Sequence, residues 1–172
     1  MIKSCVVSVS IAFGGLLAQG SVAAADSEKT LPLAKAVEIA QTALATCKSN
    51  GYNVTVTIID PDYATRLVLR GDGASARTVE IGRRKAYTVI KMGMSSGEFG
   101  KSVAASTPTS ASPRVPGAMP PGVNGDDNLI TFAGGKQIKM DGEVVGAISV
   151  SGAPGGEKDE VCADAGLAKL AK

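Results

Sequence analysis

The sequence predicts an α/β protein of the α+β kind, in which helices pack against an antiparallel sheet. Three observations lead to this fold class. Apolar residues recur at helical spacing in two long segments, residues 32–49 and 74–93. Residues 52–70 read as two strands joined by a turn. Asp141-Gly142 lies between two further strand patterns. The predicted order is therefore helix, hairpin, helix, irregular segment, two strands and helix.

The first helix is expected over residues 32–49, and an antiparallel hairpin follows it. Pro32 suits the first turn of a helix, and Asn50-Gly51 is a usual way to end one. One face of this segment is apolar and consists of Leu33, Ala36, Val37, Ala40, Leu44 and Cys47. Residues 52–60 are rich in β-branched side chains, so they predict a strand that pairs with residues 64–70.

The second long helix, residues 74–93, carries a cationic stripe because Arg77, Arg84 and Lys91 recur every seven residues. Two interpretations stay open: a solvated helix face, or a surface that receives carboxylates or propionates. A short helix is expected over residues 95–105. Five of the eight prolines then fall within residues 107–127, where they block regular strand pairing. This loop either covers a pocket, reaches a neighbouring subunit or is a loose surface excursion.

The clearest hairpin signal lies between residues 128 and 160. Asp141-Gly142 favours a tight two-residue turn, and the nearly continuous apolar run of residues 143–151 predicts a central strand. Acidic residues open the last predicted helix, residues 157–172, as the helix dipole prefers. The glycine-rich turn before that helix lacks the phosphate-loop pattern. Gly134 and Gly135 either let a ligand approach the backbone or form a tight loop.

Residues 1–25 have the features of a secretory signal peptide. Lys3 is their only charge, residues 5–18 are mainly apolar, and Ala23-Ala24-Ala25 offers a cleavage site. The apolar run is shorter than the ~20 residues that a membrane span needs. We therefore expect a periplasmic or secreted protein, with residues 26–172 as one domain and no membrane attachment after cleavage.

Composition excludes several classes of site and partner. Without Lys3 the chain has 17 basic and 16 acidic residues, a balance that gives no support for nucleic-acid binding. The absence of histidine excludes a Ser-His-Asp triad and the common histidine metal sites. Cys47 and Cys162 remain after signal cleavage. In an oxidising compartment they either form a disulfide or stay as two separate buried thiols.

Four motifs connect the chain with a known family. They are Gly134-Gly135 before a short strand, GEVVGAISVSG at residues 142–152, GGEKDE at residues 155–160, and RRKAYT at residues 83–88. Over residues 30–172 the chain resembles the GlcG/HbpS-like haem-binding family, which includes the C-terminal module of PduO-type proteins. The resemblance implies a profilin-like fold, with helices packed on a five-stranded antiparallel sheet, and a homo-oligomer.

The resemblance also implies haem as the cofactor and suggests where it would bind. Some family members use an axial histidine, which this chain lacks, so another donor must serve. The candidates are Met92, Met94, Met119, Met140, Tyr87, Thr107 and Thr109. Lys85, Gly134 and Gly135 match recurring family positions, and Arg84 with Lys85 would suit the propionates. The chain departs from the family where Lys136-Gln137 follow the paired glycines, since a proline is usual there.

Three functions follow as alternatives. The first is an exported haem-binding protein that handles haem or senses haem or redox state. The second is an accessory or binding module for a small organic acid such as glycolate, in which Arg84 or Lys85 would hold a carboxylate without haem. The third is an enzyme, for example of haem degradation. The sequence offers no acid–base pair for an enzyme, so no catalytic residue is proposed.

Overall fold

The computed structural model describes residues 30–106 and 119–170. The elements are, in chain order, α1 (Leu33–Ser49), β1 (Thr55–Ile59), β2 (Thr65–Arg70), α2 (Arg77–Met92), α3 (Ser96–Ser106), β3 (Gly135–Met140), β4 (Glu143–Ser151) and α4 (Gly156–Leu167). This order confirms the predicted one. α2 begins three residues later than expected, because Ala74 N donates to Gly71 O at 3.1 Å in a turn that precedes the helix.

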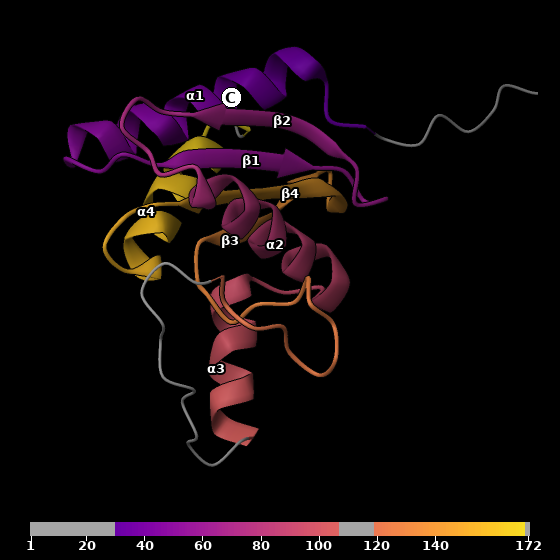
Figure 1. Ribbon diagram of the computed structural model, residues 1–172. Coiled ribbons are helices and arrows are strands. Elements are labelled where there is room, and N and C mark those ends of the chain that lie inside the picture. Colours follow the sequence, from indigo (N-terminus) through magenta and orange to yellow (C-terminus); the bar gives the residue numbers. More distant parts are fainter. Residues whose placement is uncertain (1–29, 107–118, 171–172) are drawn as a thin grey trace, which may run out of the picture.

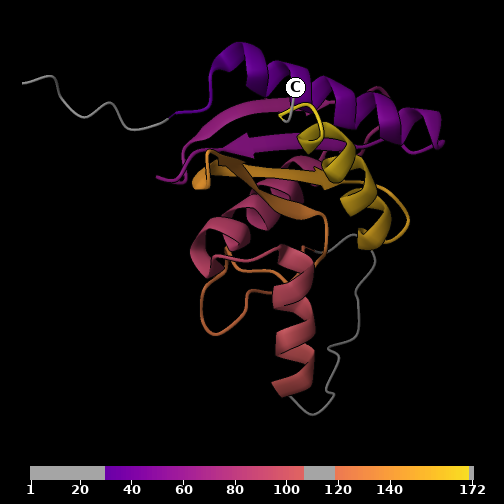
Figure 2. The ribbon, with the colours of Figure 1, turned by 180° about the vertical axis from the view of Figure 1, so that it is seen from behind.

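The strands form one antiparallel sheet in the order β2-β1-β4-β3. Helices α1 and α4 lie side by side over one face, and α2 covers the other (Figure 1, Figure 2). Both views also show α3 projecting away from the sheet. The α+β class is therefore confirmed, and β4 is a central strand as its apolar sequence indicated.

The number of strands differs from the one that the resemblance implies. The described residues contain a sheet of four strands, not five. Between α3 and β3 they form only the isolated bridge between Val123 and Asp126. Pro120 and Pro121 have no N–H to donate, and side chains of α2 hold this segment instead of a sheet edge.

The two faces of the sheet have different chemistry. The face toward α1 and α4 is apolar and includes Val56, Ile58, Ile148 and Val150. The face toward α2 carries small polar residues at one end and a small apolar cluster, formed by Ile59 and Ala147 with α2, at the other. Thr55 Oγ1 shares a hydrogen bond of 2.7 Å with Thr78 Oγ1 of α2, and Ser149 Oγ donates to Gly82 O at 2.7 Å. A Cβ on Gly82 would lie 2.9 Å from Thr57 Oγ1, so glycine allows this close approach.

Cys47 of α1 and Cys162 of α4 form a disulfide, with Cα atoms 5.5 Å apart. Both side chains are fully buried. The sequence left this pairing open, and the side-by-side packing of α1 and α4 decides it. Gly166 helps the two helices to approach, because a Cβ there would meet Ile39 O at 2.5 Å. The bond therefore crosslinks the first and last helices over the apolar face.

The predicted signal peptide, residues 1–25, lies outside the described residues. Within the described part of the chain, none of the helices has the length and the apolar character that crossing a membrane would require.

Loss of the disulfide should weaken the fold without changing it. We expect the paired change Cys47→Ala and Cys162→Ala to lower the free energy of unfolding by ~2–5 kcal/mol, as is usual for a native disulfide. Urea titration followed by circular dichroism measures this. A reductant should destabilise the natural chain but leave the variant unchanged. Equal stability of the oxidised natural chain and the variant would contradict a stabilising bond.

Candidate functional site

Lys85, one of the predicted ligand-binding residues, is an internal cation. Its side chain is 2% exposed, and Nζ donates to Asp159 Oδ2 at 2.7 Å and to Val150 O at 2.9 Å. Asp159 Oδ1 accepts from Ala153 N at 3.0 Å. Burial lowers the pKa of Lys85 and raises the pKa of Asp159, while their mutual attraction opposes both shifts. The pair ties the middle of α2 to β4 and to the start of α4.

Gly134 and Gly135, two further predicted site residues, lie against this pair. A Cβ on Gly134 would lie 2.7 Å from Lys85 Nζ and 2.6 Å from Val150 O, and Gly134 has a φ of 125°. Gly135 N donates to Ser96 Oγ at 2.8 Å. Protein atoms fill the space beside both glycines. Their close approach therefore serves packing between β3, α2 and α3.

Arg84 is also internal, with 5% of its surface exposed. Its Nη1 donates to Pro120 O at 2.7 Å, and its buried Nε has no partner among the described residues. Burial lowers the pKa of this guanidinium. Arg77 and Lys91 are exposed, so the cationic stripe is not one continuous surface. Arg84 anchors the segment that precedes β3.

Neighbouring α2 residues hold the same segment, residues 119–130. Arg83 Nη2 donates to Asn128 Oδ1 at 2.6 Å. The Tyr87 hydroxyl donates to Asp126 Oδ2 at 3.0 Å, and this bond raises the pKa of Tyr87. Met92 is half-buried at the end of α2. The other two predicted site residues, Thr107 and Thr109, lie outside the described residues.

A broad groove opens directly beyond Gly135, between α3, β3 and the face of α4. Its volume is about 760 Å³, within the range of ~300–1,000 Å³ that is usual for ligand pockets. We call it the lysine groove. Its lining residues are Gly93, Met94, Ser95, Gly97, Glu98, Lys101, Lys136, Gln137, Lys139, Glu160 and Leu167. Three of them are lysines, and none of the three is among the residues that the sequence predicts to bind a ligand.

Three lysines and two glutamates, Glu98 and Glu160, line the lysine groove, so the lining carries an excess of one positive charge that favours an anionic ligand. Lys136 Nζ lies 3.4 Å from Asp164 Oδ1, whose side chain is 57% exposed, so this ion pair is weak. Lys101 and Lys139 form no ion pair with a carboxylate of the described residues. The carboxylate of Glu98 instead accepts from Ser95 N at 2.9 Å, as part of a capping box at the start of α3.

One sequence signal could have located the groove. In the family that the chain resembles, a proline usually follows the paired glycines. Here Lys136 takes that position, and its side chain lines the groove. Lys101 and Lys139 gave no such signal, because an exposed lysine on a helix or an edge strand is ordinary. Only the meeting of α3 and β3 gathers them in one place.

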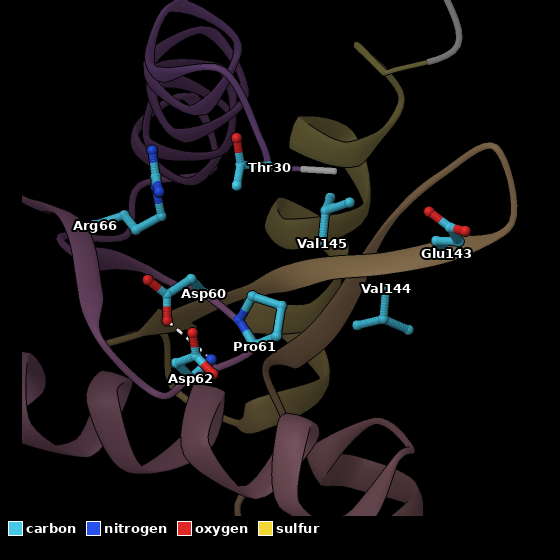
Figure 3. Close-up of a pocket in the computed structure, with 8 residues that line it drawn as sticks. All are labelled: Thr30, Asp60, Pro61, Asp62, Arg66, Glu143, Val144 and Val145. Carbon is cyan, nitrogen blue, oxygen red and sulfur yellow. Dashed lines mark hydrogen bonds between the residues drawn. The ribbon is translucent and has the colours of Figure 1, made fainter. Parts of the chain in front are cut away.

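A second, smaller pocket of about 260 Å³ lies beside the turn between β1 and β2 (Figure 3). Asp60, Asp62 and Arg66 are among its lining residues. The Asp60 carboxylate accepts from Asp62 N at 3.0 Å and from Ala64 N at 2.9 Å, and Figure 3 shows the first of these bonds. This carboxylate stabilises the turn, in which Tyr63 has a φ of 67°. Its small size and occupied carboxylate favour the lysine groove as the ligand site.

The donor groups of the described residues decide what the lysine groove can hold. They include no cluster of three His, Cys, Asp or Glu side chains able to bind a metal ion. The lysine ammonium groups suit carboxylates, and the apolar side chains of Met94 and Leu167 suit an apolar body. Haem combines propionates, which the lysines suit, with an apolar macrocycle, toward which the lining offers only the side chains of Met94 and Leu167. Met94 also offers a thioether to the iron.

Comparison with known proteins agrees with the fold. A family model described as "Haem degrading protein HbpS-like" matches residues 31–168. The crystal structure of HbpS is 28% identical, with a TM-score of 0.69 over 94% of this chain and 99% of that one. The crystal structure of a PduOC:Heme complex is 20% identical, with a TM-score of 0.66 over 81% and 94% of the two chains.

A curated relative from Citrobacter freundii is an uncharacterized 15.0 kDa protein of the dhaT-dhaS intergenic region. It is 28% identical over 140 residues, which make up 80% of this chain and 90% of the relative. The similarity therefore extends over nearly the whole described chain.

Replacing only one member of the Lys85–Asp159 pair should destabilise the fold more than replacing both members with apolar residues. We expect Lys85→Met to lower the free energy of unfolding by ~3–5 kcal/mol, because Asp159 is left buried without its cation. Adding Asp159→Leu should recover part of this loss. Urea titrations of the two variants measure the difference. A double variant that is less stable than Lys85→Met would contradict the argument.

Substitution of Gly134 should destabilise the fold mainly because a side chain would clash with its neighbours, and not only because of its positive φ. Gly134→Ala should destabilise the fold strongly, because its Cβ would meet Val150 O and Lys85 Nζ. Gly125 is a matched control, since its φ is also positive at 78° but a Cβ there would meet nothing within 4 Å. Thermal unfolding should give a clearly lower Tm for Gly134→Ala than for Gly125→Ala. Equal Tm values would show that backbone strain alone decides both positions.

Proposed function

Because the chain belongs to the HbpS-like family, we propose that it is an exported haem-binding protein whose ligand lies in the lysine groove. The observation that carries this proposal is the gathering of Lys101, Lys136 and Lys139 around an open groove with apolar side chains. A PduOC:Heme complex with the same fold supports haem as the ligand. Haem handling or haem and redox sensing is the role that we assign to such binding.

The chain's own residues would divide the work of binding. Lys101, Lys136 and Lys139 hold the propionate carboxylates, and Met94 with Leu167 covers part of the macrocycle. The capping box of Ser95 and Glu98 keeps α3 in place. When bound, haem supplies an iron centre that can exchange electrons. Lys85 acts behind the groove, because it binds Asp159, the neighbour of the lining residue Glu160. Arg84 holds the segment before β3 through Pro120 O.

Export and assembly belong to the same proposal. The signal-like residues 1–25 support translocation, and the Cys47–Cys162 disulfide fits an oxidising compartment. N-terminal sequencing of protein recovered outside the cytoplasm should begin near Asp26. Light scattering of that protein should give a multiple of the monomer mass, because relatives imply a homo-oligomer. A cytoplasmic protein that retains residues 1–25 would overturn the assignment of export.

Haemin titration followed by absorbance tests both whether the protein binds haem and whether haem binds in the lysine groove. The natural chain should give a Soret shift at micromolar haemin. Replacing Lys101, Lys136 and Lys139 with glutamine should weaken binding about tenfold, since exposed ion pairs contribute ~0.2–1 kcal/mol each. Lys48→Gln is the matched control, because Lys48 is an exposed lysine of α1 away from the groove.

The titration tests haem binding and the location of the site as two separate claims. No Soret shift with the natural chain would overturn haem binding, and a small carboxylate would then become the better ligand for the groove. A shift that the triple lysine variant retains in full would leave haem binding intact and overturn the lysine groove as its site.

A further inference from the structure

The outer edge of β3 has no strand beside it. β3 ends the sheet order β2-β1-β4-β3, so among the described residues it pairs with a neighbour on one side only. Val150 N of β4 donates to Gly134 O at 2.9 Å. Because peptide groups alternate in direction along a strand, the even-numbered residues of β3 face β4. Gly135, Gln137 and Lys139 therefore direct their N–H and C=O groups outward.

The backbone of Gln137 and Lys139 is free to pair with an added strand. Gly135 N donates to Ser96 Oγ at 2.8 Å, which closes the start of the edge. Beyond it, Gln137 and Lys139 make no main-chain hydrogen bond outside the sheet with any of the described residues. Unpaired strand edges of this kind recruit extended segments of other chains.

The lysine groove follows this open edge. Its lining combines residues of β3 with residues of α3 and of α4, and both ribbon views show β3 between β4 and α3 (Figure 1, Figure 2). Most of the lining side chains are polar or charged. Such a lining suits the peptide groups and polar side chains of an extended chain, which can pair with β3 while it lies in the groove.

The side of the groove toward α3 carries an excess of positive charge. Lys139 lies on the face of β3 on which a Cβ of Gly135 would meet Ser96 Oγ of α3 at 3.0 Å. Lys101 of α3 lines the groove with Lys139, and neither lysine forms an ion pair with a carboxylate of the described residues. Glu98 is the single acidic residue of α3 in the lining.

The side toward α4 has the opposite balance. Lys136 Nζ already lies 3.4 Å from Asp164 Oδ1, and Glu160 lines the groove on the same helix. Leu167 adds an apolar side chain. Acidic side chains of a bound strand are therefore favoured toward α3, and uncharged ones are favoured toward α4.

We propose that the lysine groove binds an extended acidic segment of a partner protein, which adds to the four-stranded sheet at β3. Opposite charges on neighbouring strands stabilise a sheet, so carboxylates at every second position fit Lys139 and Lys101. A second copy of this chain fits less well, because pairing two β3 edges brings like-charged lysines together. The inference goes beyond haem binding and does not depend on it.

The test uses the haem-free protein and synthetic peptides. The probe is acetyl-Thr-Glu-Val-Glu-Val-Glu-Thr-amide, whose glutamates share one face of an extended chain. Directly opposite residues that exchange hydrogen bonds point to the same face, so glutamates facing Lys139 turn their N–H groups toward β3. One control peptide carries N-methyl groups on its glutamates, and a matched one carries them on its valines. Calorimetric titration measures affinity, and amide hydrogen exchange measures protection of Gln137 and Lys139.

We expect the probe to bind and to slow the exchange of both outward amides. N-methylated glutamates should weaken binding at least about tenfold, because several hydrogen bonds are lost and each contributes up to about a tenfold change. N-methylated valines should have a much smaller effect, because their N–H groups face away from β3.

Protein variants locate the peptide in the groove. Gln137→Pro removes an outward N–H, which an edge strand tolerates, and it should weaken binding. The paired change Lys101→Glu and Lys139→Glu should weaken binding at least about tenfold, because two attractions become repulsions. Lys48→Glu on α1 is the matched control and should leave affinity unchanged. Circular dichroism checks that each variant keeps the fold.

Three outcomes would overturn the inference. The first is a probe that does not bind. The second is equal binding of the probe and its glutamate-methylated form without amide protection, which would show that charge alone attracts the peptide. The third is a lower molecular mass of Gln137→Pro in light scattering, which would show that this edge joins copies of the chain. Haemin titration decides the proposed function separately, because neither the peptides nor their readouts involve haem.

Discussion

The ion pair between Lys85 and Asp159 is the contact on which the arrangement of this domain depends. The two side chains are almost fully removed from water, at 2% and 3% exposed. Burial of two charges is costly unless each finds good partners. Here the ammonium also reaches Val150 O and the carboxylate also accepts from Ala153 N. The requirement to satisfy both charges fixes α2, the end of β4 and the start of α4 relative to one another.

The position of β3 follows from the same pair. Gly134 lies so close to Lys85 Nζ that no side chain fits between them, and Gly135 donates to Ser96 at the start of α3. The next residue along the chain is Lys136, which faces the lysine groove. A displacement of the buried pair would therefore move the wall of the groove. The buried charges of Lys85 and Asp159 neutralise each other inside the protein. The lysines of the groove remain available to a ligand at the surface.

The fold was largely predictable because its signals are local, whereas the site arises from contacts that no local pattern encodes. Asp141-Gly142 marks a hairpin wherever it lies between strands, and β4 was located residue for residue. The pairing of Cys47 with Cys162 stayed open, since it depends on how distant helices pack. Arg84 and Lys85 carry the charge of ligand-binding residues, but only burial shows that protein atoms already engage them. Lys101 and Lys139 become neighbours through the tertiary fold alone.

The polar layer between α2 and the sheet also has a consequence for how the domain tolerates sequence change. On the opposite face, Val56, Ile58 and their neighbours are held by contacts that depend on volume, so apolar residues of similar size can replace one another. Thr55 and Ser149 form directed hydrogen bonds with α2, and Gly82 leaves no room for a side chain. Few other residues can therefore replace them. Exchange among apolar residues of similar size should therefore be tolerated on the apolar face, whereas substitutions at Thr55, Ser149 and Gly82 should disturb the contact with α2.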